Sequence, residues 1–345
     1  MEQMRLGRTN LRVGRTGFGA LPIQRVPMDE AVLLLKKAHA AGITFYDTAR
    51  GYSDSEEKIG RAFASVRTSV VLATKSSASD RKTLLDHLDT SLKTLKTDYV
   101  DVLQLHSPKA LGDPADPESS YAGLVEARRR GAARFLGIST HRLDMARDVV
   151  RSGLFDTVQF PLSAISDAKD LSLVDLCRKH DVGLIAMKGM CGGLLTDAVS
   201  AFAFLRQFEN VVPIWGVQRE SELDQFLALE ENPPALDDAM RARIEKDRVE
   251  LAGEFCRACG YCLPCPADIP IPMAARMTLL MGRAPWRQFV TPEWQEKMSR
   301  IQQCTECGQC RERCPYELDT PALLRKMFED YEKFLIDHAV DRVMS

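Results

Sequence analysis

The chain has little of what marks membrane, secreted or nucleic-acid-binding proteins. Its 46 Lys and Arg residues nearly balance its 48 Asp and Glu residues, and no block of five like charges occurs. Binding to nucleic acid is therefore not expected. No run of about 18 apolar residues is present, which argues against a membrane span. The N-terminal residues also lack the apolar core of a signal peptide, so these absences together predict a soluble cytoplasmic protein.

Cysteine is scarce over most of the chain. Of ten cysteines, only Cys177 and Cys191 precede residue 256. A secreted disulfide scaffold is normally short and follows a signal peptide, whereas this chain has 345 residues. The gathering of the other cysteines near the C-terminus therefore indicates reduced thiols that hold a metal.

The first two thirds of the chain show the pattern of repeated βα units. Short apolar runs alternate with amphipathic helical patterns such as A-V-L-L-L-K-K-A-H-A, and such alternation predicts parallel strands joined by helices. The expected strands are 15–20, 43–47, 70–75, 99–106, 135–139, 157–160, 183–188 and 211–216. Eight units of this kind close into a (β/α)₈ TIM barrel. An open doubly wound sheet is the alternative.

The alternation stops near the pair Pro233-Pro234, and prolines become frequent afterwards. Proline disfavours regular strands, so a second, smaller domain is expected. We expect a barrel over residues 1–235, a connecting helix over 236–254, and a cysteine-rich domain over 255–345 that ends in a helix.

Polar residues end three successive strands of the expected barrel. Asp47, Lys75 and His106 occupy these ends, and Tyr52 follows Asp47 on the next loop. The carboxyl ends of barrel strands form one face, where active sites are built. A lysine cation is expected to lower the pKa of a nearby tyrosine. Tyr52 would then donate a proton to a carbonyl oxygen, with His106 orienting that oxygen.

The sequence around these residues resembles the aldo-keto reductase family. The resemblance rests on L-G-R-T-N-L-R-V, F-Y-D-T-A-R-G-Y-S-D-S-E-E-K-I-G, L-A-T-K, L-Q-L-H, G-I-S-T and V-Q-F, in this order over roughly residues 4 to 230. It implies that Asp47, Tyr52, Lys75 and His106 form a catalytic tetrad, with Tyr52 as the general acid. It also implies an NAD(P)H-dependent oxidoreductase that acts on a small carbonyl or alcohol substrate.

The same resemblance implies a nicotinamide cofactor, with NADP(H) favoured over NAD(H). Ser139 and Gln159 would hold the carboxamide, and Gly216 and Val217 would lie along the phosphates. The full set of expected cofactor contacts is Gly19, Ala20, Asp47, Ser139, Thr140, Gln159, Met187, Lys188, Gly216 and Val217. Only Arg219 is basic in W-G-V-Q-R-E-S-E, where well-known members carry basic residues for the 2′-phosphate of NADP. His141 and Cys191 remain open as further pocket residues.

Eight cysteines form two runs near the C-terminus, C-R-A-C-G-Y-C-L-P-C-P at 256–266 and C-T-E-C-G-Q-C-R-E-R-C-P at 304–315. The second run has the C-x₂-C-x₂-C-x₃-C-P spacing of bacterial [4Fe–4S] ferredoxins, and the first is one residue shorter before its last cysteine. Two Cys₄ zinc sites are the alternative. Zinc ribbons, however, usually pair separated C-x₂-C knuckles, so two [4Fe–4S] clusters are favoured.

This region resembles a two-cluster bacterial ferredoxin, in which the last cysteine of each run serves the other cluster. The resemblance implies one cluster on Cys256, Cys259, Cys262 and Cys314. It implies a second cluster on Cys304, Cys307, Cys310 and Cys265.

An aldo-keto reductase barrel transfers two electrons at once as hydride, whereas a [4Fe–4S] cluster transfers one electron at a time. Three hypotheses describe how the two parts of this chain work together. The barrel is a working carbonyl reductase with structural or redox-sensing clusters. Alternatively, the clusters carry electrons from a ferredoxin- or flavodoxin-type partner to the barrel, which would need a flavin or a radical intermediate. In the third hypothesis, the barrel no longer turns over and serves as a nicotinamide sensor.

Overall fold

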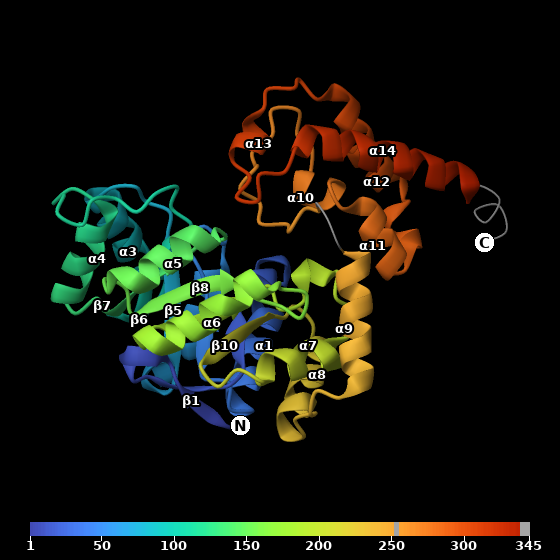
Figure 1. Cartoon of the computed structure of the whole chain (residues 1–345). Coiled ribbons are helices and arrows are strands. Elements are labelled where there is room, and N and C mark those ends of the chain that lie inside the picture. The colour runs from blue at the N-terminus through green and yellow to red at the C-terminus, as the bar shows by residue number, and fades with distance from the viewer. Residues whose placement is uncertain (252–254, 339–345) are drawn as a thin grey trace. The chain divides into compact units, whose positions relative to one another are not determined.

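A computed structural model describes residues 1–251 and 255–338, which form two compact units. The first unit comprises Met1–Gly189 and Asp197–Ile244, and the second comprises Met190–Thr196 and Glu245–Ser345. Residues 252–254 of the expected connecting helix and 339–345 of the expected C-terminal domain lie outside the described residues. Figure 1 labels many of the helices and strands of both units.

Eight parallel strands of the first unit close into a barrel in the order β10-β3-β4-β5-β6-β7-β8-β9. The strands are β3 (Gly17–Gly19), β4 (Phe45–Asp47), β5 (Val71–Ser76), β6 (Val100–His106), β7 (Ala133–Ser139), β8 (Thr157–Pro161), β9 (Gly183–Met187) and β10 (Val211–Gly216). Their residues are mostly buried, as expected for strands that have side chains inside the barrel and helices outside it. The closed barrel confirms the expected fold and excludes the open sheet.

Helices alternate with the strands, as the sequence pattern predicted (Figure 1). They are α1 (Met28–Ala40), α2 (Ser55–Phe63), α3 (Arg81–Leu95), α4 (Ser120–Arg129), α5 (Leu143–Ser152), α6 (Ala168–His180), α7 (Ala198–Arg206) and α8 (Glu220–Glu231). Short 3₁₀ turns are η1 (Gly7–Thr9), η2 (Pro22–Arg25), η3 (Ala64–Ser69) and η4 (Cys191–Gly193). Side-chain caps mark several helix starts. The Asp80 carboxylate, for example, accepts the Thr83 N–H at 2.8 Å and so satisfies one of the N–H groups left unpaired at the start of α3.

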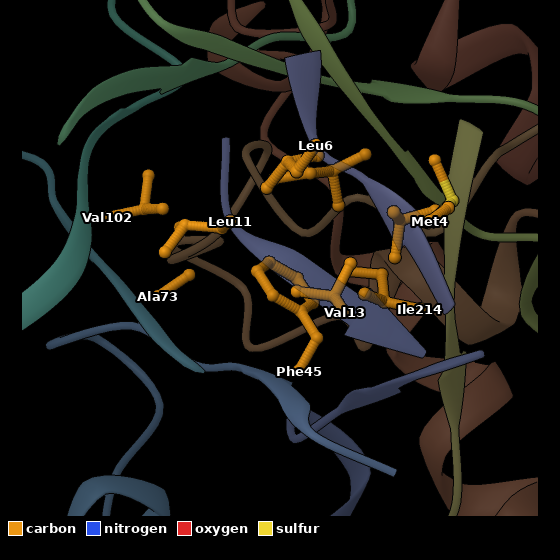
Figure 2. Packing of buried hydrophobic residues seen from close by; sticks show 10 residues of the cluster. Met4, Leu6, Leu11, Val13, Phe45, Ala73, Val102 and Ile214 are labelled. Carbon is orange, nitrogen blue, oxygen red and sulfur yellow. The ribbon is translucent and has the colours of Figure 1, made fainter. Parts of the chain in front are cut away.

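A hairpin that was not among the expected strands closes the amino-terminal end of the barrel. It pairs β1 (Gln3–Arg5) with β2 (Arg12–Gly14) in antiparallel fashion. Figure 2 shows its apolar side chains against residues that point into the barrel. The packed residues are Met4, Leu6, Leu11 and Val13 of the hairpin segment and Phe45, Ala73, Val102 and Ile214 of the barrel strands. This apolar layer leaves the opposite, carboxyl ends of the strands for polar groups.

The second unit has no β-strand in residues 245–251 and 255–338. Its helices are the end of α9 (Asp238–Glu250), then α10 (Ile271–Ala274), α11 (Met277–Arg283), α12 (Pro292–Ser299), α13 (Gln309–Glu312) and α14 (Thr320–Asp337), with 3₁₀ turns η5 (Trp286–Phe289) and η6 (Arg300–Gln303). Ile269, Met277 and Leu324 are buried in its core. The long α14 is the expected C-terminal helix. Over the described residues, no helix has both the length and the apolar character needed to cross a membrane.

The segment Met190–Thr196 belongs to the second unit although it lies between a barrel strand and a barrel helix in sequence. Arg276 is only 5% exposed, and its Nη1 donates to the Gly192 carbonyl oxygen at 2.9 Å. Nη1 of Arg283 donates to the Leu194 carbonyl oxygen, also at 2.9 Å. Two arginines of the second unit therefore hold the loop that follows β9.

Candidate active site and cluster-binding pockets

Strand register brings polar residues from distant parts of the sequence to neighbouring positions. Lys75 of β5 pairs with Gln104 of β6, and His106 of β6 pairs with Ser139 of β7. All lie toward the carboxyl ends of parallel strands, where the ends converge on one face of the barrel. The expected tetrad residues on β5 and β6 therefore lie at the face of the barrel that the carboxyl ends of the strands form.

Asp47 and Lys75 form an ion pair in the barrel interior. Lys75 Nζ lies 2.6 Å from Asp47 Oδ2, and both side chains are almost fully buried. Lys75 also donates to the Thr48 carbonyl oxygen at 2.7 Å, and Gln104 Nε2 donates to Asp47 Oδ1 at 3.1 Å. Burial raises the pKa of Asp47 and lowers the pKa of Lys75, while each residue's charge acts in the opposite direction on its partner. The additional hydrogen bonds supply what a buried ion pair needs to offset the loss of water.

Tyr52 and His106 lie beside this pair. Their rings meet edge-to-face with centroids 5.7 Å apart, and Lys75 Nζ is 5.2 Å from the centre of the Tyr52 ring. Burial lowers the pKa of His106 to about 3, assisted by the charge of Lys75. The imidazole is therefore neutral near pH 7.

The pKa of Tyr52 differs from the sequence-based expectation. Burial, assisted by the charge of Asp47, raises the pKa of Tyr52 far above its usual value. We had expected Lys75 to lower it. Lys75, however, is paired with Asp47, so its positive charge is largely compensated, and burial penalises tyrosinate. Tyr52 is therefore protonated near pH 7 and has a proton to donate.

Sequence patterns did not identify two polar residues near the Asp47–Lys75 pair, Gln104 and Glu56. Gln104 is fully buried, and its Nε2 also donates to Gln159 Oε1 at 3.0 Å. The L-Q-L-H motif contained a usable signal, because residues two apart on a strand point to the same face. Glu56 accepts the Thr74 hydroxyl at 2.7 Å and pairs with Arg50, which places another carboxylate near Lys75.

Gln159 lies close to Asp47, Thr140 and Met187, which are also among the expected cofactor contacts. Gln159 Nε2 approaches Asp47 Oδ2 at 3.3 Å and Met187 Sδ at 3.7 Å. The Thr140 N–H donates to the Gln159 carbonyl oxygen at 3.0 Å. Ser139 is buried one strand away, and its hydroxyl donates to the Leu105 carbonyl oxygen at 3.4 Å. These residues are thus continuous with the Asp47–Lys75 pair.

The expected phosphate-side contacts lie on β3 and β10. Gly19 pairs with Gly216 in the barrel register, and the Ala20 N–H donates to the Asp47 carbonyl oxygen at 2.8 Å. Val217 follows and is buried. A Cβ on Gly216 would lie 3.0 Å from Pro22 Cγ, so glycine fits this position without displacing Pro22.

Two further residues lie near this end of the barrel. Lys188 directly follows β9 and has a positive φ of 61°. His141 is buried, and burial together with Lys188 and His106 lowers its pKa well below the usual value. The structure therefore brings His141 into the electrostatic neighbourhood of the expected site, a position that the sequence reasoning had left open.

In the second unit, the cysteines line two pockets. The first pocket is lined by Cys256, Cys259, Cys262 and Cys314. The second pocket is lined by Cys265, Cys304, Cys307 and Cys310, and Cys262 also borders it. These are the same two sets of four that the ferredoxin resemblance implied. The assignment of Cys314 to the first cluster and of Cys265 to the second remains a prediction.

The pockets suit a cluster better than a single metal ion. Across residues 1–251 and 255–338, no three His, Cys, Asp or Glu side chains lie close enough to hold one ion. A cubane has four separate iron corners and therefore accepts thiolates that are spread around a hollow. Burial and the neighbouring thiols of Cys256 and Cys259 raise the pKa of Cys262 to about 12, so a cationic iron would be needed to keep it as a thiolate.

The closed barrel, with an ion pair, a tyrosine and a histidine at its strand ends, defines an enzyme-type (β/α)₈ barrel, and the chain continues into a unit with two cysteine-lined pockets. Residues 10–203 match the aldo/keto reductase family, and residues 255–319 match the 4Fe-4S dicluster domain. The chain belongs to the aldo/keto reductase family and carries a C-terminal 4Fe-4S dicluster domain, as the motifs predicted.

Relatives and solved structures agree with this assignment. The chain is 30% identical to L-galactose dehydrogenase of Arabidopsis thaliana over 220 residues, which cover 57% of this chain and 68% of that protein. It is 25% identical to NADH-specific methylglyoxal reductase of Escherichia coli, covering 68% and 80%. A thermostable aldo-keto reductase solved with the inhibitor epalrestat matches 72% of this chain and 100% of its own, with a TM-score of 0.61 and 25% identity.

Proposed function

We propose that the protein is an NAD(P)H-dependent oxidoreductase that interconverts a small carbonyl compound and its alcohol. The observation that supports this most directly is the buried Asp47–Lys75 pair at 2.6 Å, with Tyr52 and His106 in contact beside it. The names of the two relatives, a sugar dehydrogenase and a methylglyoxal reductase, point to the same substrate class of small hydroxy and carbonyl compounds.

In this proposal, a bound nicotinamide would supply the hydride, and the residues of the chain would handle the substrate oxygen. Tyr52 donates its proton as negative charge develops on that oxygen. Neutral His106 donates a hydrogen bond that orients the oxygen, and the part of the Lys75 charge that Asp47 does not offset favours the tyrosinate left behind. Asp47 holds Lys75 in place. Ser139 and Gln159 would hold the carboxamide of the cofactor.

The loop after β10 bears on the choice between the two nicotinamide cofactors. Glu222 Oε2 accepts the Gln218 and Arg219 N–H groups at 2.9 and 3.2 Å. Its Oε1 accepts Arg219 Nε at 2.8 Å. A carboxylate therefore occupies the amino-terminal end of α8 and engages the basic side chain of that loop. Although the family resemblance favours NADP(H), this arrangement favours NADH, because Glu222 would repel a 2′-phosphate.

A second candidate function is supported by the dicluster domain. Eight cysteines line two pockets in two sets of four, as two electron-transfer clusters require. In this version, a ferredoxin- or flavodoxin-type donor feeds one electron at a time through the clusters. The barrel would then act on electrons received from them.

One anaerobic experiment separates the two functions. Purified protein with intact clusters is mixed with NADH or NADPH, in parallel with a Tyr52→Phe variant, and the visible absorbance of the clusters is followed. Methylglyoxal reduction is measured in the same samples. For the first function we expect nicotinamide oxidation that needs methylglyoxal, unchanged cluster absorbance, and a loss of about 10²- to 10⁴-fold in Tyr52→Phe.

Bleaching of the clusters by NAD(P)H without a carbonyl compound would favour the second function. Failure to bind either nicotinamide, measured by fluorescence titration, would contradict both the carbonyl reductase and the nicotinamide-sensor versions.

A further inference from the structure

Arg257 lines the first pocket, directly after Cys256 in the sequence. Its guanidinium carbon lies 4.1 Å from the Phe255 ring centre and 5.4 Å from the Tyr316 ring centre. Tyr316 is itself part of the pocket lining. Contacts with two aromatic rings restrict the guanidinium and hold its plane in a defined place.

The Nε–H of Arg257 is buried and has no hydrogen-bond acceptor. The residues that the structure describes also provide no carboxylate that forms an ion pair with this arginine, although most other arginines of the second unit have one. A buried donor without an acceptor is costly, and such an atom commonly marks the place where a ligand binds. The thiolate and sulfide sulfurs of an iron–sulfur cluster are acceptors of the kind that this donor lacks.

The second pocket has a different electrostatic character. Among the described residues that line it there is no arginine or lysine, and the charged one is Glu306. Glu306 is exposed and pairs with Arg325 at 2.8 Å, so its field is largely screened. The two pockets therefore differ by one partly buried cation that lacks a counter-charge among the described residues.

We propose that Arg257 donates its Nε–H to the cluster held by Cys256, Cys259, Cys262 and Cys314 and sets the order in which the two clusters accept electrons. One-electron reduction makes a cluster more negative, and a positive hydrogen-bond donor stabilises that state. The first-pocket cluster is therefore the one with the higher reduction potential. A one-electron donor of the ferredoxin type would reduce it first, with no bond broken and no proton transferred. This inference concerns the cluster unit alone and does not depend on carbonyl reduction.

The test is a redox titration of the holoprotein with dithionite, followed by electron paramagnetic resonance. In the Arg257→Met variant, we expect the higher of the two midpoint potentials to fall by at least about 59 mV. This shift corresponds to a tenfold change in the equilibrium constant of a one-electron reduction. The lower midpoint stays in place. Arg257→Lys keeps the charge but loses the planar donor, so its shift is smaller. Arg287→Met is the matched control, because Arg287 also lies over an aromatic ring, 5.0 Å from the Trp286 centre, but lines neither pocket.

The proposal is overturned if neither midpoint moves in Arg257→Met, if only the lower one moves, or if Arg287→Met shifts the same midpoint equally. Iron analysis shows whether Arg257→Met still carries both clusters. If the Arg257→Met variant has lost a cluster, the hydrogen bond is tested in the wild-type protein instead. Protein labelled with ¹⁵N in the arginine guanidinium is reduced and examined by electron–nuclear double resonance. We expect a ¹⁵N coupling that disappears in Arg257→Lys, and its absence from the wild type would refute the hydrogen bond.

Discussion

The barrel and the cluster-binding unit differ in what holds their candidate site residues in place. In the barrel, Asp47, Lys75 and Gln104 come from three strands and are held by the hydrogen-bonded sheet and by each other. In the second unit, the cysteines lie on short helices and loops without any strand in the described residues. The barrel site is thus formed by the strands of one sheet, whereas the cluster pockets are lined by loops, short helices and the start of α14.

The largest expected effect follows directly from this contrast. Anaerobic removal of iron with a chelator should unfold residues 255–337 and leave the barrel folded, because cluster ligation supplies folding free energy that a small proline-rich unit lacks. Hydrogen exchange should show at least about 100-fold faster exchange there, a change of about 2.7 kcal/mol or more. Unchanged amide protection of the second unit would show that its own apolar core is sufficient, and β5 and β6 serve as the internal control.

Within the barrel, removing one partner of the buried pair should be strongly destabilising. Lys75→Met leaves Asp47 charged and buried, which we expect to cost about 3–5 kcal/mol. The double variant Asp47→Asn/Lys75→Met should recover much of this loss, because it leaves no buried charge. Urea unfolding monitored by the fluorescence of buried Trp215 measures both. Equal destabilisation in the single and double variants would contradict the electrostatic explanation.

A substitution of Arg276 tests whether residues 190–196 belong to the second unit. Arg276→Leu removes donors to the Cys191 and Gly192 carbonyl oxygens, and unsatisfied buried acceptors cost about 1–3 kcal/mol. We expect faster amide exchange confined to 190–196 and to the surroundings of Arg276 in the second unit. Arg287→Leu, an exposed arginine of the same unit, is the control. Exchange that also rises throughout the barrel strands would contradict the assignment of this loop to the second unit.

The preference between nicotinamides should shift modestly with charge at the start of α8. Glu222→Gln retains an acceptor for the backbone N–H groups but removes the negative charge. The kcat/KM ratio of NADPH to NADH should rise about 10-fold, or about 1.4 kcal/mol. Glu220→Gln, which alters an exposed acid of the same helix paired with Lys37, should leave the ratio unchanged. An equal change in both variants would show that general surface charge, and not Glu222, decides the preference.

The smallest expected change is in the protonation of His106, which should stay neutral from pH 8 to pH 5. Because burial and Lys75 lower the pKa of His106 to about 3, the folded state binds no proton there between pH 8 and pH 4, whereas the unfolded state does below its ordinary pKa of about 6.5. Stability from this group is therefore present above pH 6.5 and is lost as the pH falls toward 3. The His106 resonances, assigned with His106→Gln, should not shift between pH 8 and pH 5, and a midpoint near 6.5 would show that the ring is hydrated.

Local patterns predicted several features correctly. Alternation of apolar runs with helical patterns is a property of neighbouring residues, so the eight barrel strands could be found before any contact was known. The C-x₂-C-x₂-C spacing is likewise local, and it led directly to the 4Fe-4S dicluster domain. The hairpin β1–β2 was missed because its two strands have three residues each. That length is too short for a period of two to stand out.

Other features depend on contacts between distant residues. Gln104 gained its role only when the register placed it beside Lys75 and within 3.1 Å of Asp47. The predicted direction of the shift in the Tyr52 pKa was also wrong. Burial outweighs the compensated charge of Lys75, and a sequence motif does not show how deeply a side chain is buried. Segment 190–196 belongs to the second unit through two arginines more than 80 residues away.

The amino-acid sequence by itself determined the barrel class, the family and the 4Fe-4S dicluster domain, since each rests on short-range periodicity, motifs or spacing that the chain carries before it folds. Only the tertiary structure decided which polar groups share a buried site and what protonation state burial imposes on them. These depend on distances and on exclusion of water, which arise only when remote segments pack together. Arg257 shows the difference most clearly: in sequence it is one residue between two cysteines, and in the fold it is a buried donor without an acceptor at the edge of a cluster pocket.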